Sequence, residues 1–184
     1  MSDDDLRWRL GARLPGHDYK IFKTGFVEAT HPRIDHTKTF SLIEAVDWVN
    51  VLALTSDRQV VLLKQYRPGI DRICLEIPGG MVDPGEDAVQ AAVRELLEET
   101  GYGAGKAELL ASVAPNPAIQ NNRLHTVVVS DVEKLGEPKP EGDEILDVLT
   151  VPLSEMRERL VRGEVEHALV VVAFAQLAFR HHLP

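Results

Sequence analysis

The segment GMVDPGEDAVQAAVRELLEETGY, residues 80–102, constrains the fold more than any other part of the chain. A regular strand cannot easily continue through Pro78-Gly79-Gly80, so a loop precedes this segment. Asp87 can accept a hydrogen bond as a helix N-cap, and Gly101 can end the helix in the left-handed conformation that glycine adopts without strain. The pattern predicts a strand that ends in a glycine loop, followed by a helix over residues 88–100.

This helix separates its side chains by chemistry. At about 100° per residue, one side collects Val89, Ala92, Val93, Leu96 and Thr100. Glu95, Glu98 and Glu99 gather on the opposite, exposed side, where like charges at this spacing destabilise an isolated helix by a few tenths of a kcal/mol per pair. Hard divalent cations prefer such oxygen ligands, so the cluster indicates a metal site. Taken alone, three such glutamates would more often form a solvated acidic face.

Strands and helices are mixed along the chain without a regular βαβ rhythm, which favours an α+β fold. WVNVLAL and QVVLLKQY, residues 48–54 and 59–66, predict a buried hairpin around a turn at 56–58. Further strands are expected at residues 19–28, 37–45, 73–77, 108–113, 124–129 and 145–151. Helices are expected at residues 154–162 and 166–181.

Size and charge limit the function classes. The 184 residues, 44% of them hydrophobic, suffice for one domain with a sizeable core and a small appendage. We expect residues 1–45 to form a strand extension and residues 46–184 to form the main domain. The net charge of -9 disfavours nucleic-acid binding, which depends on Lys and Arg contacts to phosphate. An acidic chain can still bind a small anion when divalent cations lie between the two.

The apolar segments and the cysteine content bear on where the protein works. The longest apolar run, residues 168–175, is much shorter than the roughly 20 residues that cross a bilayer, so no membrane association is expected. Cys74 is the only cysteine, so the chain has no internal disulfide and no cysteine-based zinc site, as is usual in a reducing compartment. We expect a soluble cytoplasmic protein.

A family resemblance rests on the residues in and around the helix. The spacing G-x5-E-x7-R-E-U-x-E-E-x-G-U, in which U is a bulky aliphatic residue, is matched by Gly80, Glu86, Arg94, Glu95, Leu96, Glu98, Glu99 and Gly101. The segment therefore resembles the Nudix box, with Tyr102 in the last position where the motif has an aliphatic residue. The resemblance implies a Nudix α/β/α sandwich with a mixed sheet, preceded here by a β-rich extension.

The resemblance also implies roles for individual residues. The implied metal ligands are the side chains of Glu95, Glu98 and Glu99 and the carbonyl oxygen of Gly79. Arg94 would orient the carboxylates and, with Glu98, count among the catalytic residues, while Glu86 would be a structural carboxylate. The implied cofactor is Mg²⁺, with Mn²⁺ as an alternative. Water would attack one phosphorus of a diphosphate while the ions neutralise its oxygens.

The segment SVAPNPAIQNNRLH, residues 112–125, bears on the substrate. It resembles the substrate loop of ADP-ribose and related nucleoside diphosphate sugar pyrophosphatases, which carry a proline at a similar distance from the box. The resemblance makes Asn121, Arg123 and His125 candidate substrate contacts. The alternative is an ordinary Pro/Asn turn between strands.

Two segments upstream of the box, LLKQYRPG and CLEIPGG, resemble the same subfamily. There, an arginine matching Arg67 and a glutamate matching Glu76 reach the substrate. An arginine can grip phosphate with two parallel hydrogen bonds, although Arg67 could equally be a surface cation. Trp48 could stack on the base of a nucleotide or belong to the core.

The residue that activates water is expected in a loop beyond the box. In the resembling enzymes a glutamate on a mobile loop has this role, and GEPKPEGDE, residues 136–144, is the acidic loop of that kind. The candidates are Glu141 and Glu144. We favour Glu141 because Glu144 adjoins the expected strand at 145–151 and has less freedom to move. The alternative is a solvated acidic loop.

The function predicted from these features is metal-dependent hydrolysis of a nucleoside diphosphate sugar, of the ADP-ribose or GDP-mannose type, to a nucleoside monophosphate and a sugar phosphate. The partners expected are this small-molecule nucleotide sugar and, through the extension, a second copy of the chain in a homodimer. Alternatives are hydrolysis of dinucleoside polyphosphates or nucleoside triphosphates, and a non-catalytic nucleotide sensor. A sensor is disfavoured because all the box glutamates are present, and an RNA 5′-end hydrolase is disfavoured by the acidity.

Overall fold

The structure, a computed structural model, describes residues 2–140 and 142–181 and divides into two compact units. One, called here the N-terminal unit, consists of Met1–Val46 and Ala114–Arg123. The other, called here the main unit, consists of Asp47–Val113 and Leu124–Pro184. Each is described by itself below.

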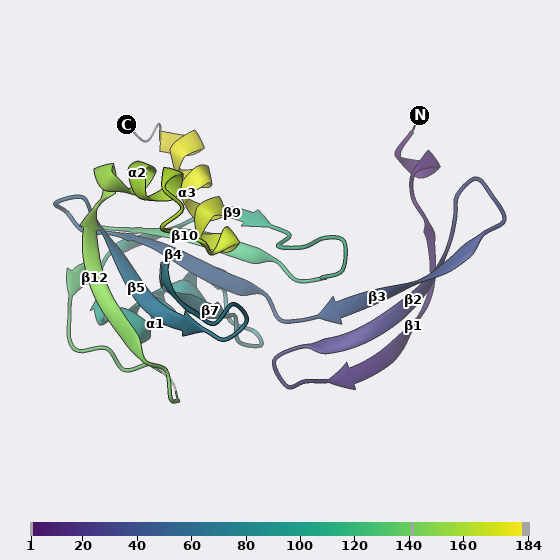
Figure 1. Cartoon of the computed structure of the whole chain (residues 1–184), viewed down its shortest axis with the longest axis horizontal. Coiled ribbons are helices and arrows are strands. Elements are labelled where there is room, and N and C mark those ends of the chain that lie inside the picture. Colours follow the sequence, from purple (N-terminus) through teal and green to yellow (C-terminus); the bar gives the residue numbers. More distant parts are fainter. Residues whose placement is uncertain (1, 141, 182–184) are drawn as a thin grey trace. The chain divides into compact units, whose positions relative to one another are not determined.

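The N-terminal unit is a three-stranded antiparallel sheet in the order β1-β2-β3 (Figure 1). Its strands are β1 (Arg9–Asp18), β2 (Lys23–Thr30) and β3 (Thr37–Glu44), preceded by a short 3-10 helix, Asp3–Asp5. The two strands expected at 19–28 and 37–45 correspond to β2 and β3, although β2 begins later than predicted. β1 was not predicted, because its glycines and Pro15 have low strand propensity. Pro15 is tolerated because β1 is an edge strand.

Residues from the 114–123 segment belong to this unit because they bond to the end of β3. The backbone N–H of Ile43 donates to the carbonyl of Ile119 (2.7 Å). The backbone N–H of Ala45 donates to Asn121 Oδ1 (3.2 Å), and Asn122 Nδ2 donates to the carbonyl of Val46 (3.0 Å). The segment therefore pairs with β3 by main-chain and side-chain bonds.

The main unit is built on a mixed sheet with the order β12-β5-β4-β10-β9. β4 and β10 are parallel, and the other neighbours are antiparallel. Two short strands attach to this path, β6 to β5 and β7 to β4. The strand bounds are β4 (Trp48–Leu54), β5 (Gln59–Arg67), β6 (Arg72–Glu76), β7 (Gly79–Met81), β9 (Lys106–Val113), β10 (Leu124–Ser130) and β12 (Leu146–Pro152), with β8 (Tyr102–Gly103) and β11 (Glu133–Lys134) as a separate pair.

Helices cover both faces of this sheet (Figure 1). α1 (Ala88–Thr100) packs on one face, where Ala92 and Leu96 meet Val51 and Val127. α2 (Met156–Val161), with the 3-10 turn Leu153–Glu155, and α3 (Ala168–His181) pack on the other face. The predicted α+β fold with a mixed sheet between helices is confirmed.

The expected hairpin of β4 and β5 is only partly formed. Leu54 and Val60 are the one registered pair between these strands. Beyond it β4 pairs with β10 and β7, while β5 pairs with β12 and β6. The two strands therefore diverge, and the space between their open ends becomes important for the site.

Candidate active site

Local signals at its two ends define α1. The side chain of Asp87 accepts a hydrogen bond from the backbone N–H of Val89 (2.9 Å), which satisfies one free donor of the first turn. Gly101 ends the helix at φ 69°, and its N–H donates to the carbonyl of Leu97 (2.8 Å). A side chain at Gly101 would place its Cβ 2.1 Å from the carbonyl oxygen of Gly136. The predicted bounds of this helix are confirmed.

Arg94 lies at the centre of an ion-pair network on α1. Its Nε and Nη2 donate to the two oxygens of Glu86, both at 3.0 Å. Its Nη1 donates to Glu95 Oε1 (2.9 Å) and Glu98 Oε2 (3.3 Å). Nη2 also donates to the carbonyl of Met81 (3.1 Å), which ties the helix to β7. One cation therefore relieves the repulsion between the carboxylates and lowers the pKa of Glu86 through its hydrogen bonds.

Glu99 lies in a different environment from the one expected. The sequence predicted an exposed side chain, but Glu99 is only 5% exposed, whereas Val93, predicted on the apolar side, is 38% exposed. The start of β7 lies against this part of α1, where the backbone N–H of Gly79 donates to Glu99 Oε2 (2.9 Å). Burial raises the pKa of the Glu99 carboxyl to about 8, and the Gly79 hydrogen bond offsets only part of that rise.

The sequence predicted a loop at Gly79 and Gly80, but both residues belong to β7, because β4 offers them a strand to pair with. They can approach α1 and β4 only because they lack side chains. A Cβ at Gly79 would lie 2.4 Å from the carbonyl oxygen of Val49. A Cβ at Gly80 would lie 2.3 Å from Glu95 Oε1. The two glycines thus bring main-chain groups against the carboxylates. Burial also raises the pKa of Glu95, against the opposing hydrogen bond from Arg94.

A pocket of about 520 Å³ opens where β4 and β5 diverge. Its size falls within the usual range for small-molecule sites, about 300 to 1,000 Å³. Its charged lining residues are Arg67, Glu76, Asp83, Arg94, Glu95, Glu98, Glu99 and Glu144. Its neutral lining includes Trp48, Asn50, Gln65, Leu124, His167, Leu169 and Val170.

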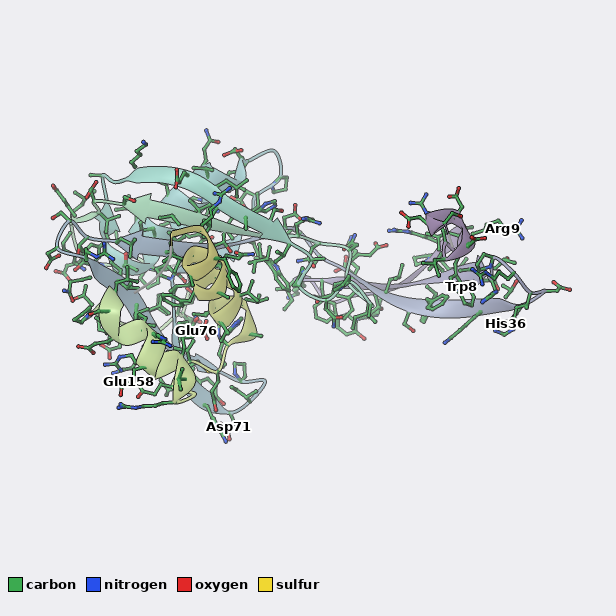
Figure 2. The ribbon with its side chains drawn as sticks, turned by 90° about the horizontal axis from the view of Figure 1, so that it is seen from above. Trp8, Arg9, His36, Asp71, Glu76 and Glu158 are labelled. Carbon is green, nitrogen blue, oxygen red and sulfur yellow. The ribbon has the colours of Figure 1, made fainter. Side chains whose placement is uncertain are left out.

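Arg67 and Glu76 form a bidentate ion pair inside this pocket. Arg67 Nε donates to Glu76 Oε1 (2.8 Å), and Nη2 donates to Glu76 Oε2 (2.7 Å). The Glu76 side chain is 3% exposed and that of Arg67 is 41% exposed. Figure 2 shows Glu76 among the side chains inside the main unit, whereas Asp71 lies at the outer end of the turn between β5 and β6. Both oxygens of Glu76 are thus engaged by Arg67, which keeps an accessible guanidinium edge.

The remaining predicted site residues differ in where the structure places them. Trp48 and Glu144 line the pocket. His125 is not a lining residue of this pocket, and its Nε2 lies 3.2 Å from Asp47 Oδ2. Asn121 and Arg123 belong to the N-terminal unit, so their contact with substrate stays a prediction. Glu141 lies outside the described residues.

Comparisons with known proteins bear on this arrangement. The model of the NUDIX domain matches residues 46–171, which include the box, the diverging strands and the first turn of α3. This chain belongs to the Nudix family. It is 36% identical over 148 residues to an ADP-sugar pyrophosphatase of Mus musculus, covering 75% of this chain and 67% of that protein. It is 30% identical to an ADP-ribose pyrophosphatase of Bacillus subtilis, covering 73% and 74%.

A likeness of fold to one solved structure extends over nearly the whole chain. The crystal structure of an ADP compounds hydrolase matches 95% of this chain and 94% of its own, with a TM-score of 0.82 at 22% identity. At that identity the match bears on the fold alone. In the described part of the chain, no helix has the length and apolar character needed to cross a membrane. The cytoplasmic location and the lack of nucleic-acid binding stay predictions.

Nudix hydrolases generally use a divalent metal ion, and the donor set of this pocket fits one in kind. Glu95, Glu98 and Glu99 offer carboxylate oxygens, the ligands that hard divalent cations prefer. As they stand, no three acidic, His or Cys side chains among residues 2–140 and 142–181 are arranged to hold an ion. Arg94 accounts for part of this, because it draws one oxygen each of Glu95 and Glu98 to itself. A bound cation would compete with Arg94 for these two groups.

Four polar lining residues were not anticipated from the sequence: Asn50, Gln65, Asp83 and His167. Asn50 stands between apolar residues of β4, and His167 precedes α3, so neither belongs to a recognisable motif. The one available signal was Asn50 itself, a polar residue in an otherwise apolar strand. Asn50 and Gln65 lie on β4 and β5 on the stretches where these two strands have diverged.

Proposed function

We propose that this Nudix hydrolase cleaves the diphosphate bond of a nucleoside diphosphate sugar, of the ADP-ribose or GDP-mannose type, with Mg²⁺ as its cofactor. The products would be a nucleoside monophosphate and a sugar phosphate. One observation carries the proposal: a single pocket brings the box glutamates together with Arg67 and Glu144. The names of the mouse and B. subtilis relatives support the class of substrate.

In this proposal α1 and the start of β7 hold the cofactor. Glu95, Glu98 and Glu99, with the carbonyl of Gly79, would be its ligands. When bound, Mg²⁺ neutralises phosphate oxygens and lowers the pKa of water. Arg94 keeps Glu95 and Glu98 on one side of α1 through its two hydrogen bonds, and Glu86 in turn anchors Arg94. Gly79 holds Glu99 from the other side.

Arg67 would bind the diphosphate, and Glu76 would fix it for that role. An arginine whose Nε and Nη2 are already paired can present only its remaining edge, so its direction is set before substrate arrives. Preorganising a charged donor in this way lowers the cost of ordering it on binding. Glu76 thus acts through Arg67, which differs from the direct substrate contact expected from the sequence.

We propose Glu144 as the base that accepts a proton from the attacking water. It lines the pocket together with Glu95, Glu98 and Glu99, and its charge is close enough to contribute to the raised pKa of Glu95 and Glu99. The carboxylates of α1 are engaged by Arg94 or Gly79 and would be engaged by metal, which leaves Glu144 for proton transfer. Glu141, favoured from the sequence, remains the rival.

A substrate screen tests the proposed reaction. Purified protein with Mg²⁺ would be offered ADP-ribose, GDP-mannose, UDP-glucose, a dinucleoside polyphosphate and a nucleoside triphosphate, with Glu99→Gln as the control for contaminating activity. We expect the highest kcat/KM for a nucleoside diphosphate sugar, with two phosphate monoesters as products. Preference for a triphosphate, or release of free sugar with a nucleoside diphosphate, would contradict the proposal.

We also propose that the protein is a homodimer formed through the N-terminal unit. Leu14 of β1 and Phe26 of β2 are paired across the strands, so they share one face of the sheet, and both are exposed. An exposed apolar sheet face of this kind is typical of an interface. Light scattering at micromolar concentration should give twice the chain mass, and Leu14→Glu with Phe26→Glu should give a monomer. A wild-type monomer would refute this part.

A further inference from the structure

The wall of the pocket next to α3 contains a buried amide with one unsatisfied end. Asn50 lines the pocket and is 6% exposed. Its Nδ2 donates to the carbonyl oxygen of Leu169 (3.0 Å), which fixes the orientation of the amide. Its Oδ1 is buried and has no hydrogen-bond partner. A buried acceptor without a partner costs free energy, so its retention calls for a reason.

Packing does not supply that reason. In the parallel register, Asn50 stands beside Thr126, and the residues two positions further on, Leu52 and Val128, belong to the apolar core beneath α3. Because side chains alternate along strands, Asn50 and Thr126 face the same layer. Apolar residues fill the rest of that layer, and the hydroxyl of Thr126 is also buried without a partner. An apolar side chain would therefore serve the core better at Thr126. At Asn50, the hydrogen bond to Leu169 accounts for the Nδ2 end of the amide but not for the Oδ1 end.

His167 adds a donor to the same wall. It lines the pocket, and its Nδ1 accepts a hydrogen bond from the backbone N–H of Leu169 (3.2 Å). A neutral ring that accepts at Nδ1 carries its proton on Nε2. The neighbouring lining residues Leu124, Leu169 and Val170 are apolar. The wall thus offers one acceptor, Asn50 Oδ1, one donor, His167 Nε2, and no formal charge. The charged groups of the pocket belong to α1, β5, β6 and the loops before α1 and β12.

We propose that Asn50 and His167 bind a hydroxyl group on the sugar phosphate half of the substrate. A hydroxyl can donate to Asn50 Oδ1 and accept from His167 Nε2 at the same time, which neither a phosphate nor an apolar ring face can do. The proposal rests on the proposed function and extends it by naming the residues that select the sugar. Because Asn50 Oδ1 is covered in the free protein, the wall must open slightly when the sugar binds.

Product inhibition tests this assignment. ADP-ribose hydrolysis by the Mg²⁺-loaded enzyme would be measured with ribose 5-phosphate or AMP as inhibitor, for wild type, Asn50→Leu and Thr126→Val. Loss of one hydrogen bond should raise the inhibition constant of ribose 5-phosphate about five- to tenfold in Asn50→Leu, and leave that of AMP unchanged. Thr126→Val, which changes the same layer behind the lining, should leave both constants unchanged.

Two outcomes would overturn the proposal. A rise for AMP alone would assign the wall to the nucleoside half, and no change for either product would mean that the Asn50 oxygen has no ligand role. If Asn50→Leu does not fold, His167→Phe, which removes the donor, should give the same selective loss. If wild type hydrolyses no nucleoside diphosphate sugar, the proposed function fails. Calorimetric binding of ribose 5-phosphate to wild type and Asn50→Leu then still decides the present inference.

Discussion

Replacing Glu99 with glutamine should stabilise the metal-free protein at alkaline pH. Burial raises the pKa of Glu99 to about 8, so the folded protein holds this proton more tightly than the unfolded chain does. Between the ordinary value near 4.5 and about 8, unfolding releases the proton, and each step up in pH lowers the free energy of unfolding. Glutamine can accept the same hydrogen bond from Gly79 and does not ionise.

The pKa sets the size of the effect. The rise from 4.5 to about 8 corresponds to an upper bound of about 5 kcal/mol for ionising Glu99 in place. The loss should accumulate at about 1.4 kcal/mol per pH unit and level off above pH 8. Little screening by solvent is expected, because the side chain is buried. An effect of this size is a large fraction of the stability of an ordinary domain.

Urea unfolding in the presence of a chelator, from pH 5 to pH 9, measures the difference. The curves of wild type and Glu99→Gln should separate as pH rises, with the variant more stable at pH 9. Glu98→Gln is the matched control, because Glu98 lies one position earlier on α1 and its side chain is 41% exposed to water. Adding Mg²⁺ should reverse the order at pH 9. Parallel curves for wild type and Glu99→Gln would refute the reasoning.

Three further predictions test the roles proposed for single residues. With Mg²⁺ present, Glu99→Gln should lower kcat by two or more orders of magnitude while the circular dichroism spectrum stays unchanged. Near-normal activity of the variant at limiting Mg²⁺ would show that Glu99 is not a metal ligand. Glu144→Gln should lower kcat strongly with little change in KM, and Glu141→Gln should not; the opposite result in steady-state assays identifies Glu141 as the base. Arg67→Ala and Glu76→Ala should each raise KM, and the KM of the double variant should be no higher than that of Arg67→Ala alone. Additive effects in this double-mutant cycle would show that Glu76 does not act through Arg67.

Local signals explain why α1 could be predicted residue by residue. Asp87 and Gly101 act through hydrogen bonds within a few residues of themselves, so they work in the same way in any fold. β1 lacks such signals and is stabilised by pairing with β2, a contact that the periodicity of its own residues does not reveal. The sequence therefore predicts the capped helix α1 well and misses a strand such as β1, whose own residues carry no strand pattern.

The burial of Glu99 shows where sequence reasoning about the site stops. Helical periodicity put Glu95, Glu98 and Glu99 on one side of α1, and all three do line the pocket. Periodicity could not show that the start of β7 buries Glu99, because the contact between Gly79 and Glu99 joins residues 20 positions apart. The same limit applies to Arg67 and Glu76, whose pairing depends on the register of β5 and β6.

The divergence of β4 from β5 explains why the pocket has a charged part and a neutral part. β4 pairs with β10 on one side, and on the other side its first residues pair with β7, so β4 is next to β5 only at its end, at Leu54. The opening exposes two layers at once: the α1 layer supplies carboxylates, and the α3 layer supplies Asn50 and the neutral groups around it. A substrate that has a charged diphosphate and an uncharged sugar matches both layers. The diphosphate would meet the charged groups, and the sugar would meet the neutral ones. A pocket confined to one face of the sheet would meet only one of these needs.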